Sequence, residues 1–157
     1  MKVLVFGGAG KIGSAVAWDL AGDEEIESIG IVARNDRSLE KTLLWIASDK
    51  VTAHALDIAD AVASGRLMKK YDVTVIALPD RRSSYRTVEA AIDAGLNAVD
   101  VLEEYHRRPD PYETEDLEVP PGLSLDEYGE SLHRRAMEND VTILDGMGFA
   151  PGLSNIT

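Results

Sequence analysis

The chain has 157 residues, of which 45% are hydrophobic, and this size fits one globular domain with its own core. Its formal net charge of −12 repels phosphate backbones and anionic membrane surfaces, so neither nucleic acid nor a membrane is an expected partner. The absence of cysteine excludes disulfides and thiolate metal sites, and no apolar run approaches the ~20 residues that cross a bilayer. These properties predict a cytoplasmic protein.

Short apolar runs that indicate strands alternate with longer runs whose apolar residues recur at helical spacing. The predicted strands cover residues 2–6, 28–33, 51–56, 73–78 and 98–102, and the predicted helices between them cover residues 12–20, 39–47, 58–67 and 85–94. Strands that alternate with helices pair in parallel through right-handed crossovers. The sequence therefore predicts an α/β fold, a Rossmann-type doubly wound parallel sheet with three layers.

The composition changes after this repeated pattern. Residues 103–124 are rich in acids, arginines and prolines and predict a loop or an insertion. A helix over 125–139, a strand over 141–144 and a glycine-rich connection over 146–152 follow. Residues 154–157 look like the first turn of a further helix. We therefore expect residues 1–157 to be one nucleotide-binding domain, a fragment of a longer two-domain protein.

A glycine turn follows the first strand and opens the first helix. Gly8, Gly10 and Gly13 have the spacing of a dinucleotide-binding turn, in which they allow a sharp bend, close approach of the pyrophosphate, and close packing of helix on strand, respectively. Free N–H groups at the start of the helix favour an anion. We expect Gly8, Ala9, Gly10, Lys11 and Ile12 to contact the cofactor; the alternative is a structural turn without a ligand.

Two similar motifs fail on residue identity. A phosphate loop of the G-x-x-x-x-G-K-[ST] type would need glycine at Val5 and a hydroxyl residue at Ile12. Short-chain reductases share the glycine spacing but need a tyrosine four residues before a lysine, and no such pair occurs. The turn is thus of the dinucleotide type.

The residues after the second strand bear on the choice between NADP and NAD. An arginine there accommodates a 2′-phosphate, whereas an acid binds the 2′-hydroxyl of NAD. Arg34 follows the strand directly, with Asn35 beside it, and this order favours NADP. NAD remains an alternative if Asp36 turns inward and Arg34 faces solvent.

The sequence singles out no catalytic residue and no metal site. His54, His106 and His133 are scattered, and none has a carboxylate or a second histidine at metal-binding spacing. Asp72, Asp80 and Asp100 lie near predicted strand ends, where acids more often cap helices or meet solvent than act in catalysis.

Several motifs together resemble the saccharopine dehydrogenase-like family, which includes lysine 6-dehydrogenase and homospermidine synthase relatives. The resemblance covers most of the chain except residues 103–124, and its last motif is the most specific. The motifs are Gly7-Gly8-Ala9-Gly10-Lys11-Ile12-Gly13, Leu56-Asp57-Ile58, Val75-Ile76-Ala77-Leu78-Pro79, Ala98-Val99-Asp100 and Gly148-Phe149-Ala150-Pro151-Gly152-Leu153-Ser154-Asn155.

This resemblance implies an oxidoreductase that exchanges hydride between NADP or NAD and the C–N bond of an amino acid or polyamine. It implies that Asp57 and Ile58 flank the adenine, that the turn formed by Ala77, Leu78 and Pro79 lines the ribose and nicotinamide, and that 150–152 approach the nicotinamide. It also implies a second, mainly β domain that supplies much of the substrate pocket, and a full-length protein that forms a homo-oligomer. A regulatory dinucleotide-binding module without catalysis is the alternative function.

Overall fold

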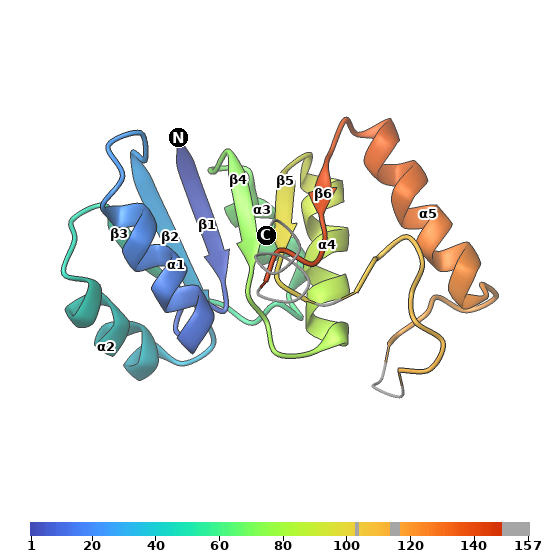
Figure 1. Ribbon diagram of the computed structural model, residues 1–157, viewed down its shortest axis with the longest axis horizontal. Coiled ribbons are helices and arrows are strands. Elements are labelled where there is room, and N and C mark those ends of the chain that lie inside the picture. Colours follow the sequence, from blue (N-terminus) through green and yellow to red (C-terminus); the bar gives the residue numbers. More distant parts are fainter. Residues whose placement is uncertain (103, 114–116, 149–157) are drawn as a thin grey trace, which may run out of the picture.

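The computed structural model describes residues 1–102, 104–113 and 117–148 (Figure 1). Strands and helices alternate through most of this range. In chain order they are β1 (Lys2–Phe6), α1 (Lys11–Ala21), β2 (Ser28–Ala33), α2 (Asp36–Ile46), β3 (Val51–Ala55), α3 (Ala61–Met68), β4 (Val73–Ile76), α4 (Arg81–Ala94), β5 (Asn97–Asp100), α5 (Leu125–Glu138) and β6 (Ile143–Leu144). The expected glycine-rich contact at 150–152 and the helical turn at 154–157 lie outside the described residues.

The six strands form one parallel sheet in the order β3-β2-β1-β4-β5-β6. Val5 of β1 is paired with Ile31 of β2 on one side and with Val75 of β4 on the other. The chain winds outward from β1 to β3 and then returns to place β4 beside β1. In such sheets a ligand crevice forms where the winding direction reverses, beyond the carboxyl ends of the strands. That crevice lies here between β1 and β4.

Side chains of the central strand alternate between the two faces of the sheet, and each face has its own core. Val3 and Val5 belong to a buried cluster with α1 and α2, whereas Leu4 and Phe6 belong to a larger cluster with α3, α4 and α5. This alternation follows from the two-residue period of a β-strand. Helices thus cover both faces, and the predicted doubly wound fold with three layers is confirmed (Figure 1).

Several predicted boundaries were wrong by two to four residues. β4 ends at Ile76 and not at residue 78, and the chain bends at Pro79 and Asp80. α3 begins at Ala61, after a turn in which the backbone N–H of Asp60 donates to the carbonyl of Asp57 at 2.9 Å. α4 begins at Arg81, since Asp80 caps it by accepting a hydrogen bond from the N–H of Ser83. None of the described helices combines the length and apolarity needed to cross a membrane.

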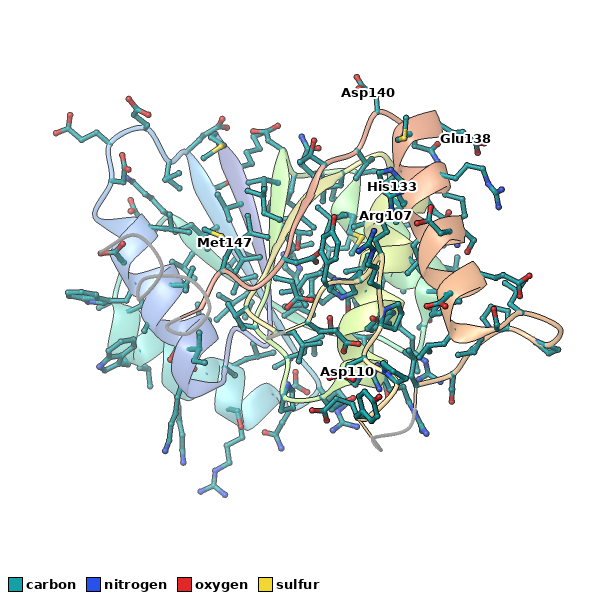
Figure 2. All side chains as sticks on the ribbon, turned by 45° about the vertical axis from the view of Figure 1, so that its right-hand side comes forward. Arg107, Asp110, His133, Glu138, Asp140 and Met147 are labelled. Carbon is teal, nitrogen blue, oxygen red and sulfur yellow. The ribbon has the colours of Figure 1, made fainter. Side chains whose placement is uncertain are left out.

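We refer to residues 101–124, between β5 and α5, as the excursion. Its described residues contain no helix or strand, as the composition predicted. Figure 2 shows Arg107 and Asp110 of this segment, and His133 and Glu138 on the adjacent helix α5. The excursion is held against α4 by hydrogen bonds from Arg81 to the backbone carbonyls of Asp110 and Glu113.

Candidate functional site

The glycine turn leaves β1 at the reversal of winding. Gly7 takes a left-handed conformation, with φ of 75°, and its carbonyl accepts a hydrogen bond from the N–H of Gly10 at 2.8 Å. The N–H of Gly8 donates to the carbonyl of Val32 at the end of β2. The sharp bend that we assigned to Gly8 therefore lies one residue earlier, at Gly7, because only Gly7 in this turn has a positive φ.

The glycines of the turn differ in what surrounds the position of a side chain. A Cβ atom on Gly8 would lie 2.6 Å from Ile31, and one on Gly13 would lie 2.4 Å from the carbonyl oxygen of Gly7. At Gly10 the nearest such atom, again the Gly7 oxygen, is 3.1 Å away. Gly8 and Gly13 are thus required by packing, whereas Gly10 faces away from the protein, where a bound phosphate would approach.

The first turn of α1 has neither a side-chain cap nor an acidic residue, which is typical of an anion-binding helix end. Gly10 is the N-cap of α1, with no side-chain hydrogen bond to the helix and no acidic residue in the first turn. The other described helices have side-chain caps, from Asn35, Asp60, Asp80 and Ser124. The first N–H groups of a helix have no partner within it. Those of Lys11 and Ile12 are therefore available to a pyrophosphate, which the helix dipole also favours.

A cavity of about 480 Å³ begins at this turn and extends along the carboxyl edge of the sheet. Gly7 lines its beginning, and the ends of three further strands supply its walls. These walls consist of Val32, Ala33 and Arg34 at the end of β2; Leu56, Asp57, Ile58 and Ala59 after β3; and Leu78, Pro79, Asp80, Arg82, Ser83 and Arg86 around the start of α4. The volume is suitable for the adenosine part of a dinucleotide.

The structure brings most of the predicted contact residues to this edge. Arg34, Asp57, Ile58, Leu78 and Pro79 line the cavity. The predicted residues Gly8, Ala9, Gly10, Lys11 and Ile12 form the adjoining turn and the start of α1. The proposed ligand contacts of these residues remain predictions.

Two of the predicted contact residues, Asn35 and Ala77, form hydrogen bonds within the protein at this edge. Oδ1 of Asn35 accepts a hydrogen bond from the backbone N–H of Ser38 and so caps α2. The backbone N–H of Ala77 donates to the carbonyl of Phe6, and the Ala77 carbonyl crowds the position of a Cβ on Gly7. The Ala77 backbone therefore places the turn after β4 directly against the glycine turn.

The cationic side chains of the cavity are notable in a chain of net charge −12. Arg34, Arg82 and Arg86 all line it, from two sides of the crevice. Asp36, the acid that would serve NAD, is exposed in the first turn of α2 and is not part of the cavity lining. The arrangement favours a phosphorylated ribose over a free 2′-hydroxyl.

A buried polar network lies beyond the carboxyl end of β5, and sequence reasoning missed it. The Ser84 hydroxyl donates a hydrogen bond to Asp100 and lies 3.0 Å from Nε2 of His106, whose Nδ1 is hydrogen-bonded to Asp145. Burial is the main cause that raises the pKa of Asp100. Asp100 at a strand end was the one available signal in the sequence.

This network has the partners of a catalytic serine, but its serine hydroxyl is not accessible to a substrate. Ser84 and Asp100 are fully buried and His106 is 3% exposed, so no substrate reaches the serine hydroxyl. The network instead joins α4, the excursion and the end of β6. Among the described residues, no group of three or more histidines and acids has the arrangement of a metal site.

Comparisons with known proteins give the same fold. Saccharopine dehydrogenase (L-Glu forming) from Saccharomyces cerevisiae matches with a TM-score of 0.71 at 18% identity, over 98% of this chain and 28% of the yeast chain. UDP-glucuronic acid 4-epimerase from Bacillus cereus, in complex with NAD and a UDP-sugar analogue, matches with a TM-score of 0.59 at 18% identity, over 91% of this chain and 55% of that chain. AtPrR2 with NADP⁺ and (+)-pinoresinol matches with a TM-score of 0.56 at 20% identity, over 90% and 47%, respectively.

The sequence itself matches a family profile. The family is described as the saccharopine dehydrogenase NADP binding domain, and the match covers residues 3–144. The matched region includes the glycine turn, all the residues that line the cavity, and Ser84, Asp100 and His106 of the buried network. The chain therefore belongs to the saccharopine dehydrogenase NADP-binding domain family.

Proposed function

We propose that the domain binds NADP with its pyrophosphate on the start of α1 and its adenosine in the cavity. The observation that carries this proposal is continuity: Gly7 of the turn and Arg34 after β2 line one cavity. A single dinucleotide can therefore contact the amides of α1 and the guanidinium of Arg34 together. A charge-assisted hydrogen bond from Arg34 to a 2′-phosphate favours NADP over NAD.

The role that fits this domain is to hold a nicotinamide cofactor for an oxidoreductase. NADP supplies the hydride chemistry when bound, and we propose the C–N bond of an amino acid or polyamine as its partner in the reaction. The backbone of the glycine turn orients the pyrophosphate, Asp57 and Ile58 flank the adenine, and the turn after β4 lines the ribose and nicotinamide. The nicotinamide end would then lie toward the carboxyl ends of β4 and β5, beyond Ala77.

The part of the substrate pocket that faces the nicotinamide is a separate part of this proposal. Hydride transfer needs donor and acceptor held within a few ångströms, and a misplacement of about 1 Å can cost roughly a hundredfold in rate. We propose that a following, mainly β domain supplies that part of the pocket and that the complete protein forms a homo-oligomer. The chain spans 28% of the length of the yeast enzyme that it resembles in fold.

The test of binding is calorimetric titration of the chain with NADP and with NAD. The matched variants are Gly10→Val, which places a side chain where the pyrophosphate would lie, and Gly65→Ala in α3, whose added Cβ would meet nothing within 4 Å. We expect NADP to bind wild type and Gly65→Ala equally and Gly10→Val not at all. The φ and ψ angles of Gly10 are −82° and 172°, which valine adopts readily, so circular dichroism should show a folded variant.

Two outcomes would contradict this proposal. Absence of binding by wild type at millimolar cofactor would show that the turn is structural. Unchanged affinity in a folded Gly10→Val variant would place the ligand elsewhere. A separate assay of NADPH formation with amino acids and polyamines tests catalysis: we expect none from this chain, and turnover by it would contradict the need for a second domain.

A further inference from the structure

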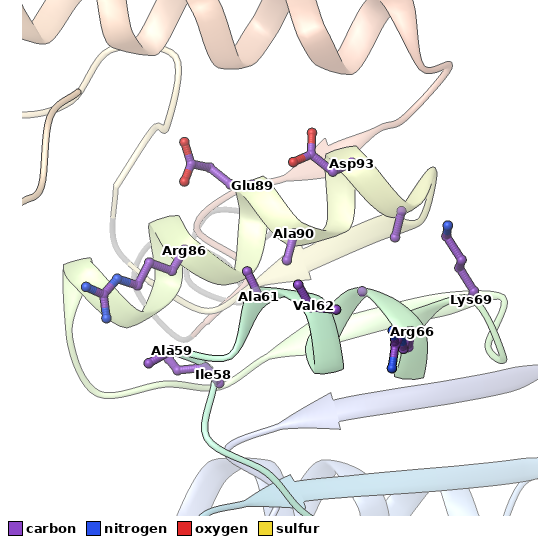
Figure 3. Close-up of a pocket in the computed structure, with 12 residues that line it drawn as sticks. Ile58, Ala59, Ala61, Val62, Arg66, Lys69, Arg86, Glu89, Ala90 and Asp93 are labelled. Atoms are coloured by element: carbon purple, nitrogen blue, oxygen red, sulfur yellow. The ribbon is translucent and has the colours of Figure 1, made fainter. Parts of the chain in front are cut away.

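Glu118 of the excursion contacts the wall of the proposed NADP cavity. Glu118 lies 2.5 Å from the guanidinium of Arg86 and 3.6 Å from that of Arg82. Both arginines line the cavity, and they are four residues apart on one face of α4. Figure 3 shows an adjoining pocket between α3 and α4, which shares Ile58, Ala59 and Arg86 with the proposed NADP cavity. A carboxylate of the excursion is thus paired with two of the three arginines there.

Packing of its neighbours supports the position of Glu118 in addition to its ion pairs. Its neighbours Leu117 and Val119 are half-buried and pack against the core cluster that includes α4. Earlier in the excursion, Glu104 forms a buried ion pair with Arg81 of α4. The carbonyls of Asp110 and Glu113 accept hydrogen bonds from the same guanidinium. These contacts therefore favour the same position of residue 118 in a variant without the charge.

The other acids of the cavity are engaged differently. Oδ1 of Asp80 accepts the hydrogen bond from Ser83 N–H that caps α4, and Oδ1 of Asp57 accepts one from the N–H of Ala59. Only Glu118, among the acids described around this cavity, forms ion pairs with its arginines in the structure. A phosphate that approaches Arg82 and Arg86 therefore meets a competing carboxylate.

We propose that Glu118 is a specificity-determining residue, which lowers the preference for NADP over NAD by competing with the 2′-phosphate for Arg82 and Arg86. This inference rests on the proposed binding of NADP in the cavity. The 2′-phosphate carries more negative charge than a carboxylate and has three acceptor oxygens, so it can displace an exposed pair. NAD lacks this phosphate and therefore leaves the ion pairs of Glu118 with Arg82 and Arg86 intact.

The coupling has a reciprocal consequence. If Glu118 opposes the binding of the 2′-phosphate, then the bound 2′-phosphate must weaken the contact of Glu118 with α4 by the same factor. NADP, but not NAD, should therefore increase hydrogen exchange of the amides around Val119. The two effects arise from the same pair of arginines.

The experiment compares Glu118→Gln with Glu130→Gln, which removes a carboxylate from the pair with Arg107. The two pairs are well matched, because Glu118 and Glu130 are each 53% exposed and their arginines are 37% and 36% exposed. Arg107 and Glu130 are not part of the lining of the proposed NADP cavity. Titrations at low salt would use NADP, NAD, and the fragments 2′,5′-ADP and 5′-AMP.

We expect Glu118→Gln to bind NADP and 2′,5′-ADP about three- to fivefold more tightly, with NAD and 5′-AMP changed less than about twofold. Glu130→Gln should match wild type. In a background with Arg82→Gln and Arg86→Gln, the effect of Glu118→Gln should disappear. A higher salt concentration should reduce the effect in the otherwise wild-type chain.

An unchanged ratio of NADP to NAD affinity in Glu118→Gln would overturn this inference and leave the proposed function intact. So would an equal gain for both cofactors, because it would reflect net charge alone. If wild type binds neither cofactor, the proposed function fails first and this inference fails with it. The two failures are therefore distinguishable in one set of titrations.

Discussion

Arg81 and Glu104 form a buried two-point ion pair that joins the start of α4 to the excursion. Nε and one terminal nitrogen of Arg81 lie 2.6 Å and 2.5 Å from the two carboxylate oxygens of Glu104, and both side chains are 5% exposed. The phenol of Tyr85 also donates to Glu104, and burial raises the pKa of that phenol, which therefore stays neutral. This arrangement ties residues 104–113 to the helix whose other face lines the cavity.

Glu104→Gln should lower the free energy of unfolding by about 3 kcal/mol, because it leaves a buried guanidinium without its counter-charge. Urea denaturation measures this loss. The control is Glu130→Gln, whose exposed pair with Arg107 should contribute less than about 1 kcal/mol. Equal losses in the two variants would show that the Arg81 pair contributes no more than a surface pair.

Gly13→Ala should destabilise the fold by about 1–3 kcal/mol, because the new Cβ overlaps the backbone of the glycine turn. That Cβ would lie 2.4 Å from the carbonyl oxygen of Gly7, which cannot move without shifting the turn. In Gly65→Ala the added methyl group is in open space, and the helix should gain about 0.5–1 kcal/mol. Thermal unfolding with opposite shifts would support this difference, and a neutral Gly13→Ala would contradict it.

Arg34→Ala should weaken NADP binding about ten- to a hundredfold and leave NAD binding unchanged, since one charge-assisted bond to the 2′-phosphate is removed. Calorimetric titration with both cofactors measures the two affinities. Arg37→Ala is the matched control, because Arg37 is exposed in the first turn of α2 and is not part of the cavity lining. Equal loss of both cofactors in Arg34→Ala would mean that Arg34 acts on the adenine or on the fold.

Asp100 should make the protein less stable as pH rises. Burial raises its pKa above the ordinary value of 3.8, so the folded state holds the proton more tightly than the unfolded state. Its favourable contribution is complete below pH 3.8 and is lost as pH rises through the folded pKa. The stability of Asp100→Asn relative to wild type should therefore increase with pH across that window, as measured by urea denaturation at several pH values. A difference independent of pH would contradict the raised pKa.

Local sequence patterns were sufficient for the architecture. The alternation of short apolar runs with helical runs predicted each of the described strands and helices, because burial of one face imposes a period on each type of element. Acids near strand ends were expected to cap helices or to meet solvent, and Asp80 caps α4, which begins four residues before the predicted start. The glycine spacing with the strand before it and the helix after it also predicted where the turn would lie.

These local patterns could not predict the contacts between segments that lie far apart in the sequence. Gly7 and not Gly8 takes the positive φ, and the carbonyl of Ala77, just after a neighbouring strand, leaves no room for a side chain at Gly7. His106 seemed an ordinary histidine, since its partners Ser84 and Asp145 are 22 and 39 residues away in the sequence. Such proximity follows from the order of strands in the sheet and not from local spacing.

The sequence by itself therefore determined the fold class, the position of the glycine turn and the arginine that follows the second strand. The tertiary structure decided which charges share a cavity, and it placed Glu118 of the excursion against Arg82 and Arg86 of α4. The physical reason is that periodicity and helix capping depend on neighbours within a few residues. Ion pairing and burial depend instead on the packing of elements that the chain separates widely.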